Sequence, residues 1–197
     1  MEDLVPNSIH NGKECTSSLA TIVETLDANA LTSFLKKNSS NGTIIHKLMS
    51  TGEIAEVDAI CQKLSGEAIV ELLMVTTSGG RTAVHEAALK DQVIVLNCVL
   101  ECLASDEAFK VLMMKDTGGA TALHVAASRS YVKSVRSMLN YLTSEQRFNL
   151  LKVHDNRGEA VVDRFFKCSS ETQKEIQDYY QAACVFVVNR SMNKEKR

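Results

Sequence analysis

Three histidines recur at equal steps along this chain, and histidine is both a common metal ligand and a frequent general base. They are His46, His85 and His124, which end the phrases ThrIleIleHis at 43–46, ThrAlaValHis at 82–85 and ThrAlaLeuHis at 121–124. Each phrase begins 39 residues after the one before it. A metal site or a set of cooperating bases needs its histidines to converge, whereas a fixed step of this length places them in the same position of successive repeat units. The spacing therefore favours one structural role that is repeated in each unit.

Two cysteines have a spacing that could contribute to a metal site. Cys98 and Cys102 are four residues apart in a predicted helix, so their thiols share a face. A structural zinc site takes about four ligands, and no second spaced pair of Cys or His accompanies this one. A pair of core or half-buried thiols is the favoured interpretation.

Other segments lack the patterns that catalysis needs. The segment GlyGlyArgThr at 79–82 has neither the Lys nor the preceding strand of a phosphate-binding loop. No nucleophile elbow or other local signature marks a hydrolase triad among the Ser, His and Asp residues. We therefore expect a protein that is not an enzyme and that uses no metal or cofactor.

Composition excludes two classes of partner. The chain has 197 residues, 45% of them apolar, and its 22 basic residues nearly balance its 24 acidic ones. No global field would attract nucleic acid or an anionic membrane, so we expect neither as a partner. The tail at 189–197 carries Arg190, Lys194, Lys196 and Arg197, which could form a weak nuclear or lipid-headgroup signal. A solvated end is the favoured interpretation, because Glu195 interrupts a short run.

Cysteine usage and the N-terminal residues indicate a location inside the cell. The six Cys do not form the tight framework that staples small secreted domains. The N-terminus lacks a basic start followed by an apolar stretch, and no segment approaches the roughly 20 apolar residues that span a bilayer. We expect a soluble cytoplasmic protein, with a nuclear location left open.

The elements around the histidines recur with the same 39-residue step. Gly80, Gly119 and Gly158 mark a turn that needs a positive φ, and Asn41 holds this place in the first unit. After the turn, Thr82 caps a first helix with paired alanines that allow close packing, and a second apolar helix follows around 93–100. A third apolar segment also recurs, and Thr-x-x-Gln at 143–146 predicts that it begins as a short helix with a capping box.

These repeats predict an all-α fold with atypical ends. We expect disorder at 1–15 and in the basic tail at 189–197, with one repeat domain at 16–188 between them. Its parts are an incomplete leading unit at 17–40, repeats at 41–79, 80–118 and 119–157, and a degenerate closing repeat with a capping helix at 158–188. In the closing repeat Asp163 replaces the histidine, and Ile176 and Tyr179 fall on one face of the capping helix.

Two segments carry a resemblance to a known family. GlyArgThrAlaValHisGluAlaAla at 80–88 and GlyAlaThrAlaLeuHisValAlaAla at 119–127 resemble the central phrase of the ankyrin repeat. The resemblance implies an α-solenoid of stacked helix-turn-helix repeats joined by β-turn fingers, in which the histidines bond to nearby backbone and tie the turns together. The chain departs from the family in that Ala83 and Ala122 replace its Pro. Its unit is also longer than the family's roughly 33 residues, so we expect an extra short helical connection in each repeat.

The resemblance also implies a function, which is non-catalytic binding of a protein partner through the finger tips and the exposed positions of the first helices. By register, the expected contact residues are Lys47, Arg81, Glu86, Ala120, Val125, Glu159 and Arg164. Their mixed charge does not identify the partner, and we expect a monomer. Two alternatives stay open: a host-directed effector of an intracellular bacterium, and an architectural or oligomerising segment that uses ValPheValVal at 185–188 as its contact.

Overall fold

The computed structural model describes residues 15–39, 42–165, 174, 177–179 and 181. Expectations about 1–14, the tail at 189–197 and the segment 185–188 fall outside these residues, as does the turn position of Asn41. The first described helix begins at Cys15, so the disorder expected at 1–15 does not include its last residue.

The described residues are mostly helical, which confirms the all-α class. The first helices of the units are α3 (Ile44–Thr51), α6 (Ala83–Leu89), α9 (Ala122–Ala127) and α12 (Val161–Phe165). The second helices are α1 (Cys15–Thr25), α4 (Ile54–Lys63), α7 (Val93–Glu101) and α10 (Val132–Asn140). The third helices are α2 (Ala28–Leu35), α5 (Gly66–Leu73), α8 (Ser105–Leu112) and α11 (Ser144–Leu151). A two-stranded antiparallel sheet, β1 (Asn38–Ser39) and β2 (Gly42–Thr43), precedes α3 and pairs Asn38 with Thr43.

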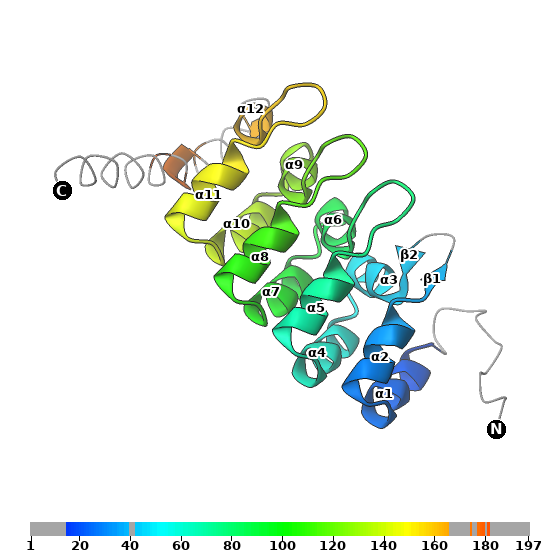
Figure 1. Cartoon of the computed structure of the whole chain (residues 1–197). Helices are drawn as coiled ribbons and strands as arrows, with labels where there is room; N and C mark the ends of the chain where they lie inside the picture. The colour runs from blue at the N-terminus through cyan, green and yellow to red at the C-terminus, as the bar shows by residue number, and fades with distance from the viewer. Residues whose placement is uncertain (1–14, 40–41, 166–173, 175–176, 180, 182–197) are drawn as a thin grey trace, which may run out of the picture.

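The helices lie in three rows, because each one packs on its counterpart in the next unit. In the first row, α3 contacts α6, α6 contacts α9 and α9 contacts α12. The second helices follow the order α1, α4, α7 and α10, and the third helices the order α2, α5, α8 and α11. Figure 1 shows the rows side by side, with the loops that precede the first helices all projecting on one side.

Small residues allow the first helices to approach one another closely. Ala87 and Ala88 of α6 and Ala126 and Ala127 of α9 are fully buried. α6 begins after Thr82, the N-cap predicted from the sequence, and α9 begins after Thr121; both threonines have an extended backbone. The first helices therefore start in register and stay short.

The predicted extra connection is a helix of eight residues in each complete unit. The capping box at its start is present in α11, where the backbone N–H of Gln146 donates to the Thr143 hydroxyl at 3.3 Å. Gln146 also joins neighbouring units, since its amide donates to the Asp106 carboxylate at 2.7 Å and accepts from the Ser105 hydroxyl at 2.6 Å. The third helices thus add a packed row to the structure.

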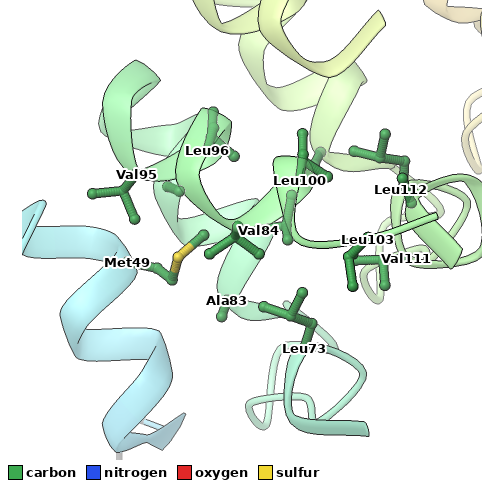
Figure 2. Close-up of a cluster of buried hydrophobic side chains, with 14 of the residues drawn as sticks. Met49, Leu73, Ala83, Val84, Val95, Leu96, Leu100, Leu103, Val111 and Leu112 are labelled. Atoms are coloured by element: carbon green, nitrogen blue, oxygen red, sulfur yellow. The ribbon is translucent and has the colours of Figure 1, made fainter. Parts of the chain in front are cut away.

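The apolar core runs continuously from unit to unit. Figure 2 shows Met49 reaching from α3 toward Val84 of α6, and both side chains are at most 1% exposed. Leu73 of α5 and Leu100 of α7 belong to the same buried cluster. Because each unit completes its neighbour's core, a single unit would expose much of its apolar surface.

The last layer differs from the others at the histidine position. Asp163 occupies the histidine position, and its carboxylate accepts the backbone N–H of Ala160 at 2.9 Å. Of the predicted capping helix, the described residue Tyr179 packs against the core and donates its hydroxyl proton to Asn140 at 2.6 Å. Ile176 lies outside the described residues.

Candidate functional site

Three short loops connect a third helix to the next first helix, and we call residues 76–82, 115–121 and 154–160 the finger loops. Each loop closes on itself with backbone hydrogen bonds, such as the one from the N–H of Asp116 to the carbonyl of Ala120 at 2.8 Å. Gly80, Gly119 and Gly158 have φ values of +71°, +73° and +76°, as the turn reading predicted. The predicted glycine positions therefore form the bend of each loop.

Neighbouring finger loops are bonded to one another. The backbone N–H of Thr117 donates to the carbonyl of Gly79 at 3.1 Å, and that of Asn156 donates to the carbonyl of Gly118 at 3.0 Å. A Cβ atom on Gly119 would lie 2.7 Å from the backbone nitrogen of Asn156. Glycine is thus needed at this position both for its backbone conformation and for the close approach of the next loop.

An aspartate at the base of the loop organises two of the three fingers. The Asp116 carboxylate accepts the backbone N–H groups of Gly118 and Ala120 at 2.8 and 2.9 Å. Asp155 accepts those of Arg157 and Glu159 at 2.8 and 3.0 Å. Sequence reasoning missed these residues, although their separation by the 39-residue step was a usable signal.

The three histidines lie buried between the first helices and the fingers and make the same contacts in each layer. In the middle layer, His85 Nδ1 accepts the backbone N–H of Thr82 at 3.2 Å and lies 2.8 Å from the Thr82 hydroxyl. Nδ1 is therefore unprotonated, so Nε2 carries the proton and donates to the carbonyl of Ala120 at 3.1 Å. His46 reaches the carbonyl of Arg81 at 3.0 Å in the same way, and His124 reaches that of Glu159 at 3.3 Å.

Each histidine thus caps its own helix and holds the finger loop of the next unit. Burial lowers the pKa of His46 and His85 below 6.5. For His124, burial and the nearby Arg164 guanidinium lower the pKa to about 4. All three imidazoles are consequently neutral near pH 7, which matches the acceptor role of Nδ1.

The expected contact residues divide into accessible and inaccessible groups. Lys47 and Arg81 are exposed. The Glu86 side chain retains 19% exposure and lies 3.6 Å from the Arg81 guanidinium.

The expectation of exposure is wrong for Ala120 and Val125, which are 9% exposed each. Ala120 lies where its finger meets the histidine of the preceding layer. Val125 lies in α9, and every residue of this helix is buried.

Arg164 is half-buried, as Glu86 is, but its guanidinium is already engaged within the structure. Its side chain is 16% exposed and forms ion pairs with Asp155 and, at 3.6 Å, with Glu159. Burial opposes ionisation of Asp155, but hydrogen bonds from the Glu159 N–H, Arg164 and the Arg157 N–H hold its pKa at about 2. Arg164 therefore stabilises the last finger, and Glu159 is half-buried beside it.

No group of metal-ligating side chains is found among the described residues. Cys98 is half-buried and Cys102 is exposed. Within the same part of the chain, no helix has both the length and the apolar character that a membrane span requires. No protein-family model matches the chain, and no curated protein matches its sequence.

Proposed function

We propose that this chain is a non-catalytic binding module of ankyrin-like build, and that a protein partner lies along its finger loops and first helices. The observation that carries the proposal is the bonding of successive fingers to one another and to the histidines of the preceding layer. These bonds use backbone groups and buried side chains, so the exposed side chains of the same segments are left to make contacts. Stacked repeats whose backbone groups hold the structure together, while their exposed side chains stay available, commonly recognise other proteins.

The proposed binding surface consists of the accessible residues on this side, among them Lys47, Arg81, Glu86 and Arg157. The surface does not include Ala120 and Val125, which are buried, or Arg164, which is paired with Asp155. We propose that the module acts as a monomer in the cytoplasm and that it needs neither metal nor cofactor.

Affinity capture from the native cell tests this proposal. The tagged full chain is compared with K47A/R157A, which changes the proposed surface, and with K110A/K133A, which removes the same charge from exposed residues of α8 and α10. All three should unfold alike, since isolated surface substitutions change stability by about 0.5 kcal/mol or less. Proteins held by the wild type and by K110A/K133A but lost from K47A/R157A would support the proposal. Capture that both variants reduce equally would contradict it.

A further inference from the structure

The exposed charges of the proposed binding surface are mostly positive, although the whole chain has a net charge of −2. Exposed cations on the finger loops and first helices, or directly after the helices, are Lys47, Arg81, Lys90, Lys115, Arg129 and Arg157. Exposed acidic residues lie mainly on the second and third helices and include Asp58, Glu67, Glu71, Glu101, Asp106 and Glu145, but exposed Lys110, Lys133, Arg136 and Lys152 lie on the same side. The proposed binding surface therefore has an excess of exposed cations, whereas the other side carries exposed charges of both signs.

Few of these cations are neutralised within the protein. Lys47, Lys90 and Arg129 form no ion pair with any carboxylate of the described residues. The acidic groups on the same side are mostly committed to its own structure, since Asp116 accepts finger N–H groups and Glu159 pairs with Arg164. Of these six cations, only Arg81 is paired with a carboxylate of the described residues, that of Glu86 at 3.6 Å.

A purely local explanation does not account for the whole set. A cation at the C-terminal end of a helix is favourable because of the helix dipole, and this applies to Lys90 and Arg129. Lys47 lies within α3, however, and Arg157 lies on a finger loop. Lys115 donates to the carbonyl of His154, a contact that leaves its positive charge unbalanced.

The cations are also distributed so that every layer contributes at least one. Positions 47, 86 and 125 of the first helices are related by the repeat step. Positions 51, 90 and 129 lie one turn further along the same face. Packed helices are about 8–10 Å apart, so the layers of α3, α6 and α9 together span about 20 Å. An extended peptide rises about 3.3 Å per residue, so about three of its residues cover one layer.

From this arrangement we infer that the partner presents an acidic, extended protein segment that crosses the layers, with carboxylates about three residues apart. The inference rests on the proposed function and specifies the chemistry of the partner. A nucleic acid fits less well, because Glu86 and Glu159 lie among the cations, and the chain's pI of about 6.2 is far below that of basic nucleic-acid-binding domains.

Fluorescence anisotropy with a defined probe tests the inference. The probe is a labelled peptide of about ten residues in which Glu occupies every third position among Ser and Gly, and the comparison peptide has Lys in place of Glu. The full chain should bind the Glu peptide but not the Lys peptide. Its affinity should fall as salt is raised from about 0.05 to about 0.3 M, because exposed charges are screened.

Charge-reversal variants locate the contact. K90E/R129E should weaken binding of the Glu peptide by about tenfold or more, since two attractive contacts become repulsive. K110E/K133E makes the same change in net charge on α8 and α10 and should alter the affinity by less than about twofold. Circular dichroism of both variants checks that the helices are intact.

Three results would overturn the inference. Equal weakening by both variants would show that only net charge matters, and tighter binding of a single-stranded oligonucleotide or of anionic lipid vesicles would assign the surface to another class of partner. If the Glu peptide does not bind, but captured proteins are lost from K47A/R157A and kept by K110A/K133A, the acidic partner is rejected and the proposed function stands. If K47A/R157A and K110A/K133A reduce capture equally, the proposed function itself is rejected.

Discussion

Lowering the pH should destabilise this protein through its buried histidines. His124 is fully buried, and its pKa is about 4 against an ordinary value of 6.5. Because the folded state holds the imidazole neutral, the unfolded chain binds more protons between these two pH values. The stabilising contribution is therefore complete above about pH 6.5 and is lost as the pH falls toward about 4.

The pKa of His124 sets the size of the effect. A histidine with these two pKa values loses about 2 kcal/mol of folding free energy between about pH 7.5 and about pH 5. His46 and His85 add to the loss, since their pKa values are lowered in the same direction. Asp155 does not contribute in this range, because its pKa is about 2 and an aspartate ordinarily titrates near 3.8.

Urea unfolding followed by circular dichroism at the two pH values measures the loss. The matched variant is His124→Asn, whose side-chain oxygen can still accept the Thr121 N–H but does not titrate. The variant is less stable at both pH values, yet its loss on acidification should be smaller than that of the wild type by about 2 kcal/mol. Equal losses in the two proteins would refute the assignment of a neutral, bonded imidazole to this position.

Two further substitutions test the finger loops. Gly119→Ala should destabilise the protein more than Gly158→Ala by about 1–3 kcal/mol: both have a positive φ, but only at Gly119 would the new Cβ meet a backbone nitrogen of the next loop at 2.7 Å. Thermal melts compare the pair, and equal shifts would count against close contact between fingers. Arg164→Ala should lower the unfolding free energy by about 1–3 kcal/mol, because it leaves the Asp155 carboxylate, 7% exposed, without its cation. Arg157→Ala is the control on an exposed arginine of the same loop, and an Arg164 variant as stable as this control would disprove the structural role.

The repeat made the local architecture predictable. Thr82 as a helix N-cap, Gly80 as the bend of a finger and the capping box at Thr143 each follow from residue chemistry within a few positions. The third helix was also predictable, because its apolar positions recur at the same step as the histidines. In each of these features, the residues that interact lie within a few positions of one another in the sequence.

Exposure was harder to predict, because in a stack it depends on residues about 35–40 positions away. Val125 has the same register as Lys47, yet it is 9% exposed, and every residue of α9 is buried. Arg164 follows the same register and is drawn into an ion pair with Asp155, a residue whose role in the finger was not anticipated. The excess of exposed cations on the proposed binding surface was likewise missed, since the total charge does not show where the charges lie.

The proposed function requires that a protein partner occupies the side of the structure that carries the finger loops. Site-specific photo-crosslinking in the native cell tests it most directly, with a benzophenone amino acid placed at Arg157 on a finger tip or at Lys110 on α8, both of which are exposed. A partner bound on the finger side should give a discrete crosslinked protein from the Arg157 position and none from the Lys110 position. A crosslink from Lys110 alone, or the same crosslinks from both positions, would contradict it.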